Sequence, residues 1–334
     1  MIGRAPVPSR DLAALPVNVL LVGQEISLTQ RRGRYVPASI RHPGKMLPEL
    51  ARQLIAAYSQ PGDWILDPMS GIGTTGVEAL HLGRNYVGIE LEPRFVAWQQ
   101  ENLELARSQG ATGSGTMLQG DARRLGAELL VTPGADIRAP IDAIITSPPY
   151  GDRLKPRPGP PSRMMQDLIR RRRMRADVIP GGYGVGPDNL GNLSDAAYLE
   201  EMRRVYAGCF EALRPGGILA VVIRPGRDRQ RLRPLHYATA QLCVELGFEW
   251  IDERIAVLSR VLAVPGETPR QFNHALFLKR LATAHLREAG YPVSLEQVEY
   301  ILVFQKPWAL PLAVGTHKSG RQAALAGALP QRIG

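Results

Sequence analysis

The stretch "WILDPMSGIGTTGVEALHLGRNYVGIELEP", residues 64–93, decides the fold class that this sequence predicts. An apolar run, "WILDP", is followed by a glycine-rich turn, "MSGIGTTG", a helical segment, "VEALHLG", and a second apolar run, "NYVGIEL". Strands and helices that alternate with short connections are typical of a parallel sheet with helices on both faces. We therefore expect an α/β fold.

The same alternation continues in both directions along the chain. Apolar residues at helical spacing predict further helices, and short apolar runs predict further strands. The last two strands are expected to form an adjacent pair at one edge of the sheet. The predicted helices cover residues 47–59, 93–110, 195–213 and 235–247, and the predicted strands cover residues 116–122, 141–147, 218–223, 248–258 and 299–306.

Three segments do not follow this pattern. Residues 1–40 are rich in proline and arginine and are expected to form an irregular N-terminal arm before one domain, residues 41–308. Residues 260–295 are expected to hold a helical insertion within that domain. The Gly/Ala-rich residues 309–334 are expected to form a flexible tail.

The composition indicates a soluble globular protein with an anionic partner. Hydrophobic residues make up 44% of the chain, and no apolar run reaches the roughly 18 residues of a membrane-spanning helix. The net charge of +10 favours nucleic acid, although an arginine-rich composition can also reflect genome bias. Cys209 and Cys243 lie in helical patterns and predict buried thiols in a reducing compartment. We expect a cytoplasmic, nucleoid-associated protein without a membrane partner.

The glycine-rich turn lies where open α/β folds bind cofactors, at the carboxyl end of a strand. Glycines there permit positive φ and a close approach of the backbone to a ligand. No Gly-Lys-Ser/Thr follows, which excludes a phosphate loop. A plain structural turn and a dinucleotide site are both still open at this point.

Carboxylates are predicted at the ends of three successive strands: Asp67, Glu90 and Asp121. The second of them can accept hydrogen bonds from both hydroxyls of a ribose. The third can accept a hydrogen bond from an adenine amino group. Although strand ends in solvent also carry Asp by chance, the combination favours an adenosyl ligand with a positive centre, namely S-adenosylmethionine.

The run "IITSPPYGDR", residues 144–153, leaves a predicted strand through two consecutive prolines. Because proline lacks an N–H and has a fixed φ, this pair cannot continue a helix or an interior strand. The run is either a turn that ends the strand or a rigid platform that presents Ser147 and Tyr150 to a substrate.

A basic segment follows this turn. Residues 151–175 contain nine Lys or Arg against two Asp, and we expect them to contact nucleic-acid phosphates; the alternative is a solvated helix face. The glycine-rich residues after it, up to 193, either close over the site or link two elements. The arm "QRRGRY", residues 30–35, is equally well an ordinary basic arm or a DNA contact. The phosphate-contacting candidates are Arg153, Lys155, Arg170, Arg171, Arg172 and Arg173.

Taken together, the motifs resemble the S-adenosylmethionine-dependent amino-methyltransferases of DNA, which make N4-methylcytosine or N6-methyladenine. The resemblance rests on "RHPGKMLPELARQLI" (41–55), on residues 62–93, on "TSPPY" (146–150), and on the later helix and strands. It implies a Rossmann-like class I methyltransferase fold, with a mostly parallel seven-stranded sheet and helices on both faces. It also implies S-adenosylmethionine as the cofactor, held by His42, Lys45, Asp67, Pro68, Ser70, Gly71, Gly73, Thr74, Thr75, Glu90 and Asp121.

The resemblance further implies that Ser147, Pro148, Pro149 and Tyr150 are catalytic. The Ser147 side chain and the Pro148 carbonyl would accept hydrogen bonds from an exocyclic amine, and Tyr150 would stack on a base flipped out of the duplex. Serine rather than aspartate before the prolines favours N4 of cytosine. Carbon-5 methylation would require a cysteine after proline at this position, and both cysteines of the chain lie in predicted helices.

The order of the motifs, cofactor first and catalytic second, is the reverse of that in many relatives, and a circularly permuted layout of the same sheet would explain it. N6-adenine methylation, methylation of an RNA base, and nucleic-acid binding without activity are the alternatives. The expected partner is double-stranded DNA, with a cognate restriction endonuclease as a further candidate. The six histidines show no clustering of metal ligands, so no metal is expected.

Overall fold

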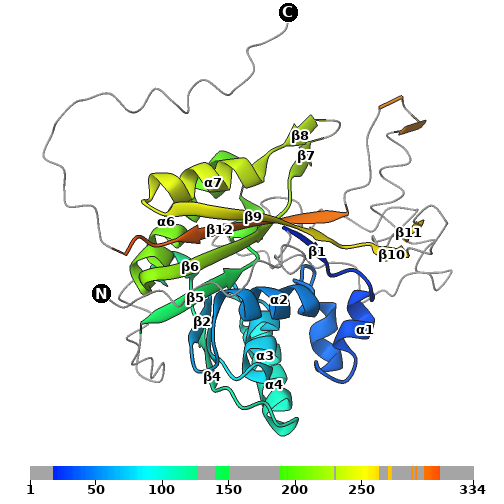
Figure 1. Cartoon of the computed structure of the whole chain (residues 1–334), viewed down its shortest axis with the longest axis vertical. Helices are drawn as coiled ribbons and strands as arrows, with labels where there is room; N and C mark the ends of the chain where they lie inside the picture. Colours follow the sequence, from blue (N-terminus) through cyan, green and yellow to red (C-terminus); the bar gives the residue numbers. More distant parts are fainter. Residues whose placement is uncertain are drawn as a thin grey trace, which may run out of the picture.

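The computed structural model describes residues 18–125, 140–149, 189–193, 195–228, 231–262, 270–272, 287–288, 290–291 and 297–308. Its main feature is an eight-stranded sheet in the order β1-β9-β12-β6-β5-β2-β3-β4 (Figure 1). The strands are β1 (Val19–Leu21), β2 (Trp64–Asp67), β3 (Asn85–Glu90), β4 (Gly115–Gln119), β5 (Ile141–Thr146), β6 (Leu213–Ile223), β9 (Glu249–Val257) and β12 (Val298–Gln305).

Along the described parts of the chain, most of the helices follow one strand and precede the next. Their bounds are α1 (Ser27–Arg31), α2 (Pro48–Tyr58), α3 (Thr74–His81), α4 (Pro93–Ser108), α6 (Asp195–Ala212) and α7 (Leu235–Glu245), with 3-10 turns η2 (Pro37–Arg41), η3 (Ala122–Arg124) and η7 (Leu190–Asn192). Two small hairpins stand apart from the main sheet: β7 (Gly226–Asp228) with β8 (Arg231–Arg233), and β10 (Arg260–Leu262) with β11 (Arg270–Phe272).

All pairings of the main sheet are parallel except those of β12, which runs antiparallel to both β6 and β9. The order β4-β3-β2-β5-β6 is the doubly wound order, in which the chain reverses direction across the sheet between β2 and β5. The predicted Rossmann-like α/β fold is therefore confirmed. The sheet has eight strands rather than seven, because β1 adds a strand outside β9.

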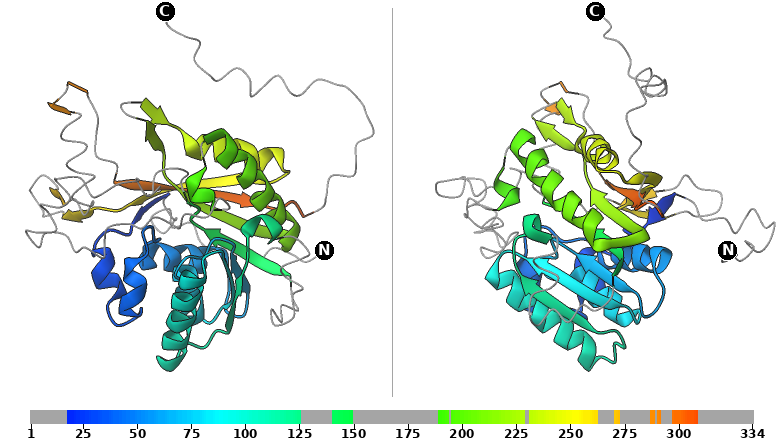
Figure 2. Two further views of the ribbon diagram at one scale, coloured as in Figure 1. Left: turned by 180° about the vertical axis from the view of Figure 1, so that it is seen from behind. Right: turned by 90° about the vertical axis from the view of Figure 1, so that its left-hand side faces the viewer.

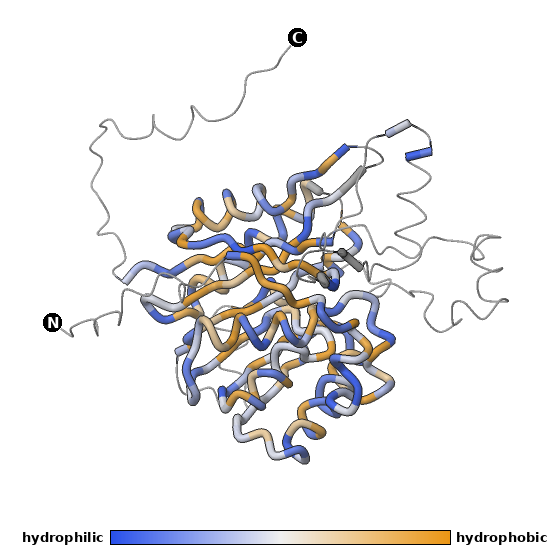
Figure 3. The backbone as a smooth tube through the Cα atoms, turned by 45° about the vertical axis from the view of Figure 1, so that its right-hand side comes forward, coloured by the Kyte–Doolittle hydropathy of each residue, from blue (hydrophilic) through white to orange (hydrophobic). Residues whose placement is uncertain are grey.

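Alternate residues of the central strands face opposite helical layers. Ile144 packs in the cluster that contains α6 and α7, whereas its neighbour Ile145 packs in the cluster that contains α2, α3 and α4. Val221 and Val222 of β6 divide in the same way. Parallel strands covered on both faces read as continuous apolar runs, which is why the sequence predicted them well. Figure 2 shows the two layers, and Figure 3 the hydrophobic strands between them.

Several expectations are refined by these elements. Cys209 in α6 and Cys243 in α7 are buried, as predicted. The late strands β9 and β12 are adjacent, as predicted, but β1 takes the edge position beyond them. Within residues 260–295, which the sequence predicted to hold a helical insertion, β10 and β11 pair as antiparallel strands. In the ranges given above, no helix combines the length and apolarity that crossing a bilayer requires.

Residues 18–40, which the sequence predicted to be irregular, form β1, α1 and most of η2. The carboxylate of Glu78 on α3, whose side chain is fully buried, fixes them to the domain. It accepts hydrogen bonds from the Tyr35 hydroxyl (3.0 Å), the Arg34 guanidinium (2.8 Å) and the Arg52 guanidinium (3.2 Å). Because Arg31 and Tyr35 are also buried, these two residues of "QRRGRY" contact the protein interior rather than DNA.

Glu78→Gln tests how strongly this carboxylate holds the N-terminal segment. The amide keeps an acceptor for Tyr35 but loses the charge that faces Arg34 and Arg52. Hydrogen bonds to charged groups contribute about 1.5–3 kcal/mol, and we expect the free energy of unfolding to fall by about that amount in urea denaturation. Glu104→Gln on the exposed face of α4 is the control, with a change within about 0.5 kcal/mol. Equal stability of both variants would contradict this role.

Candidate active site

The point where the chain reverses direction lies between the carboxyl ends of β2 and β5. In open α/β sheets, ligands bind in the crevice outside the strand ends at such a point. Asp67 is the last residue of β2, and Ser147 directly follows β5, which pairs with β2 in parallel register. The structure thus brings the glycine-rich turn and the Ser-Pro-Pro run to one edge of the sheet.

Asp67 is the connection between these two motifs. Its buried carboxylate accepts hydrogen bonds from the Thr146 hydroxyl (2.7 Å), the Thr75 hydroxyl (2.8 Å) and the Met69 N–H (3.2 Å). Burial raises the pKa of Asp67 to about 6, although these donors oppose the rise. Asp67 therefore ties β2, the turn, α3 and β5 together through bonds within the protein.

The glycine-rich turn approaches its neighbours closely. Gly71 and Gly73 have φ of +55° and +75°, which side chains rarely adopt. A Cβ on Gly71 would lie 3.2 Å from the His42 ring, and one on Gly73 would lie 2.6 Å from the Gln99 side chain. The Ser70 hydroxyl donates to the Ile89 carbonyl (3.0 Å), which holds the turn against β3. The other predicted residues of the turn, Pro68, Thr74 and Thr75, are buried as well.

Glu90, at the end of β3, faces the same turn. Its Oε2 accepts from the Gly71 N–H and its Oε1 from the Glu92 N–H, both at 2.9 Å. Burial raises the pKa of Glu90 to about 7, while these N–H donors oppose the rise. The residue is only partly covered, and each oxygen keeps a lone pair, so the carboxylate can still accept from ligand hydroxyls.

His42 also lies against the glycine-rich turn, beside Gly71, and Lys45 contacts the His42 backbone. The His42 ring packs edge-on against Phe95, with centroids 4.1 Å apart, and burial with the nearby Lys45 charge lowers its pKa to about 3. The Lys45 ammonium donates to the Ile40 carbonyl at 2.8 Å and to the His42 carbonyl. Burial, with the Arg31 charge, lowers the pKa of Lys45 to about 8. His42 is therefore neutral at pH 7.

Arg31 is a residue that the sequence did not single out for this site. It is fully buried, donates to the Met46 carbonyl and the Thr74 hydroxyl (3.4 Å), and lies 5.3 Å from the Tyr35 ring centroid. Its guanidinium thus reaches the first residue of α3. The signal available was weak, because Arg31 is one of three arginines in "QRRGR" and nothing local distinguishes it.

Asp121 lies at the predicted strand end but is already engaged. The Arg123 Nε donates to both of its carboxylate oxygens (2.9 and 2.8 Å), and Arg123 also pairs with Glu201 of α6 at 3.0 Å. Burial alone would raise the pKa of Asp121, but the hydrogen bonds and charge of Arg123 lower it overall. Asp121 is therefore held as an ionised partner of arginine.

The Ser-Pro-Pro run continues from β5 at this edge. Pro148 is buried, and Ser147 and Pro149 are half-buried. Tyr150 and the basic candidates Arg153, Lys155, Arg170, Arg171, Arg172 and Arg173 lie outside the described residues.

Asn189, where the described chain resumes after residue 149, was missed by the sequence. Its amide donates to the Glu92 carboxylate at 3.0 Å, two residues beyond Glu90. Asn189 therefore lies on the same side of the edge as Glu90 and Glu92. The turn-forming "DNLGN" around Asn189 was its sequence signal.

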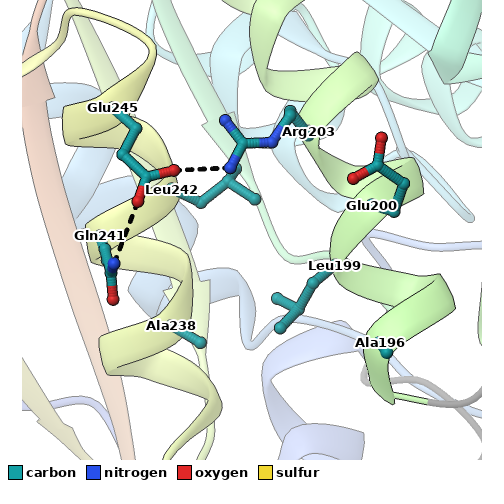
Figure 4. A pocket seen from close by; sticks show the side chains of 8 residues that line it. All are labelled: Ala196, Leu199, Glu200, Arg203, Ala238, Gln241, Leu242 and Glu245. Carbon is teal, nitrogen blue, oxygen red and sulfur yellow. Dashed lines mark hydrogen bonds and ion pairs between the residues drawn. The ribbon is translucent and has the colours of Figure 1, made fainter.

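Two other features of the described residues bear on the choice of site. No group of three or more His, Cys, Asp or Glu among them is arranged to hold a metal ion. A groove lies between α6 and α7, where Arg203 and Glu245 form an ion pair across it (Figure 4). The residues that line this groove include neither the strand-end carboxylates nor the Ser-Pro-Pro run.

The part of the chain that forms this edge of the sheet is similar to known proteins. Residues 26–101, which include the glycine-rich turn and Glu90, match a family model described as DNA methylase. This match identifies the cofactor as S-adenosylmethionine. Among curated relatives, the type II methyltransferase M.XycI of Xanthomonas campestris pv. cyanopsidis is 46% identical over 57 residues. The DNA adenine methyltransferase YhdJ of Escherichia coli K12 is 36% identical over 70 residues.

These sequence matches are short. They cover 17% and 21% of this chain, and the chain spans only 19% and 24% of the length of the two relatives. Among solved structures, a SAM-dependent O-methyltransferase from Thermotoga maritima has a TM-score of 0.45 at 14% identity, covering 81% of this chain and 69% of its own. TrmN from Thermus thermophilus has a TM-score of 0.42 at 16% identity, covering 83% and 53%.

Glu90→Gln tests the carboxylate that faces the turn. Ribose hydroxyls donate to the ionised form, which exists above the pKa of about 7, so the affinity of wild-type protein for S-adenosylmethionine should rise from pH 6 to pH 8. We expect the variant to bind about 10- to 100-fold more weakly at pH 8 and to lack this component of the rise. Isothermal titration calorimetry measures both, with Glu104→Gln as the control. A variant with wild-type affinity at pH 8 would exclude Glu90 from the cofactor site.

Proposed function

We propose that this chain transfers a methyl group from S-adenosylmethionine to an exocyclic amino group of a DNA base, at N4 of cytosine. The observation that carries the proposal is the hydrogen bond from Thr146 to Asp67. It fixes the Ser-Pro-Pro run beside the glycine-rich turn at the reversal point of the sheet.

The residues around the turn suit the adenosyl cofactor. Gly71 and Gly73 leave no room for a side chain, and Glu90 offers acceptors for the ribose hydroxyls. Lys45 and Arg31 supply positive charge near the start of α3, which suits the carboxylate at the methionine end. Asp121 is available to an adenine amino group only through lone pairs that Arg123 does not use. When bound, the cofactor supplies a methyl group on a positively charged sulfur.

The Ser-Pro-Pro-Tyr residues act on the amine that receives the methyl group. Its lone pair is delocalised into the ring, so it is a poor nucleophile. Acceptance of its N–H bonds by the Ser147 side chain and the Pro148 carbonyl turns the lone pair away from the ring and toward the cofactor. The prolines hold these acceptors rigidly, and Tyr150 stacks on the flipped base.

The choice of DNA rests on the matched family model and on the charge of the chain. The family model is described as DNA methylase, and YhdJ is named as a DNA adenine methyltransferase. The net charge of +10 and the basic residues 151–175 also suit a polyanion. A cognate restriction endonuclease as a partner stays a prediction.

The choice of base rests on Ser147, because serine in this position favours cytosine. Adenine N6 is the second candidate, since YhdJ is named as an adenine methyltransferase.

The direct test combines radiolabelled S-adenosylmethionine with unmethylated duplex DNA, followed by nucleoside digestion and mass spectrometry. We expect N4-methylcytosine from the wild type and a rate lower by about 10²–10³-fold for Ser147→Ala, the loss typical of one positioned polar group. Ser108→Ala, at the exposed end of α4, is the matched control and should keep the wild-type rate.

Each other outcome contradicts part of the proposal. N6-methyladenine would overturn the choice of base and leave the site intact. Methyl transfer to RNA but not to DNA would overturn the substrate. A Ser147→Ala variant with the wild-type rate would remove Ser147 from the chemistry.

A further inference from the structure

A second cluster of arginines lies at the same edge of the sheet as the proposed active site. Five of the ten residues in "RPGRDRQRLR", 224–233, are arginine, against one aspartate. The segment begins directly after β6, which pairs in parallel with β5, so that Val221 lies opposite Thr146. The arginines therefore leave the sheet beside the strand end that carries Ser147.

Within this segment β7 and β8 form an antiparallel hairpin that projects from the sheet (Figures 1 and 2). Arg227 pairs with Leu232, and Asp228 with Arg231, in the register of the hairpin. The register therefore places an arginine in each of two successive cross-strand pairs. Arg231 is exposed, and Leu232 is 52% exposed, so β8 stands clear of the core.

The base of the hairpin is firmly anchored. The Arg224 guanidinium pairs with Glu299 of β12 at 2.7 Å, and Glu299 is buried. On the far side of the hairpin, the His236 ring at the start of α7 stacks on Tyr300 with centroids 4.4 Å apart and planes at 20°. These contacts hold the residues on either side of the hairpin, Arg224 and His236, against β12.

A fixed, positively charged two-stranded ribbon beside a catalytic edge has the shape and charge to follow a nucleic-acid duplex. The major groove of B-DNA admits such a ribbon. Asp228 is the one acidic group on the hairpin itself, and its strand position is opposite Arg231. The charge that remains is positive, which suits phosphates rather than a protein partner with mixed charges.

We infer that the β7–β8 hairpin is a second DNA-contacting element, in which Arg227 and Arg231 contact backbone phosphates next to the flipped base. The inference rests on the proposed DNA substrate and extends it, because it places contacts on the β6 side of the Ser-Pro-Pro run. The arginines position the duplex and carry no sequence readout.

The test measures binding of a short fluorescein-labelled DNA duplex by anisotropy between about 50 and 200 mM salt. Each phosphate contact contributes about 0.9 to the slope of log affinity against log salt, so Arg227→Gln/Arg231→Gln should lower the slope by about 1.8. Arg231→Gln alone should lower it by about 0.9. The lysine pair Arg227→Lys/Arg231→Lys keeps the charges and should keep the slope near the wild-type value.

A matched control removes two positive charges elsewhere. Arg107→Gln/Arg203→Gln, on α4 and α6 outside the hairpin, should leave the slope unchanged. If the wild type binds DNA and the hairpin glutamine pair keeps the wild-type slope, the inference is overturned while the proposed function stands. If the wild type binds duplex RNA of the same sequence more tightly than DNA, the proposed substrate fails, and the DNA contact fails with it.

Discussion

The buried carboxylate of Asp67 is the interaction on which the arrangement of this protein depends. Removing a carboxylate from water is costly unless donors replace the lost hydration. Here the donors come from three places in the chain: Met69 in the turn, Thr75 in α3 and Thr146 at the end of β5. Satisfying one buried group therefore fixes the relative position of the two central strand ends. The Ser-Pro-Pro run starts one residue later, so its position follows from the same bonds.

The side chains along the carboxyl edge of the sheet differ in chemical character on the two sides of Asp67. On one side of Asp67 lie the partly buried Glu90 and the arginine-bound Asp121, which suit a nucleoside with donor groups. On the other side lie Ser147 and then the arginine-rich hairpin after β6, which suit a base and its phosphates. The doubly wound order explains this separation of the two groups of side chains. The segments that follow strands on either side of the reversal point lie on opposite sides of the crevice.

The sequence predicted what depends on local pattern. Long apolar runs predicted β2, β3, β5 and β6, and Asp67 and Glu90 were placed at strand ends simply because those runs stop there. It could not predict β1, whose three residues carry too little pattern, or the burial of Arg31, which depends on a carbonyl and a hydroxyl distant in the chain. Asp121 and Arg123 are close together in "GDARR", but their proximity in sequence does not show that they pair. The orientation of Arg123 also depends on Glu201 of α6, which is distant in the chain.

The most direct test of this account is a crystal structure of the protein with S-adenosylhomocysteine, the product that a methyl transfer leaves behind. We predict ribose hydroxyls within hydrogen-bonding distance of Glu90, the glycine-rich turn against the ligand, and the sulfur facing the Ser147 end of β5. A ligand that sits in the groove between α6 and α7, or one that makes no contact with Glu90 or the turn, would contradict it.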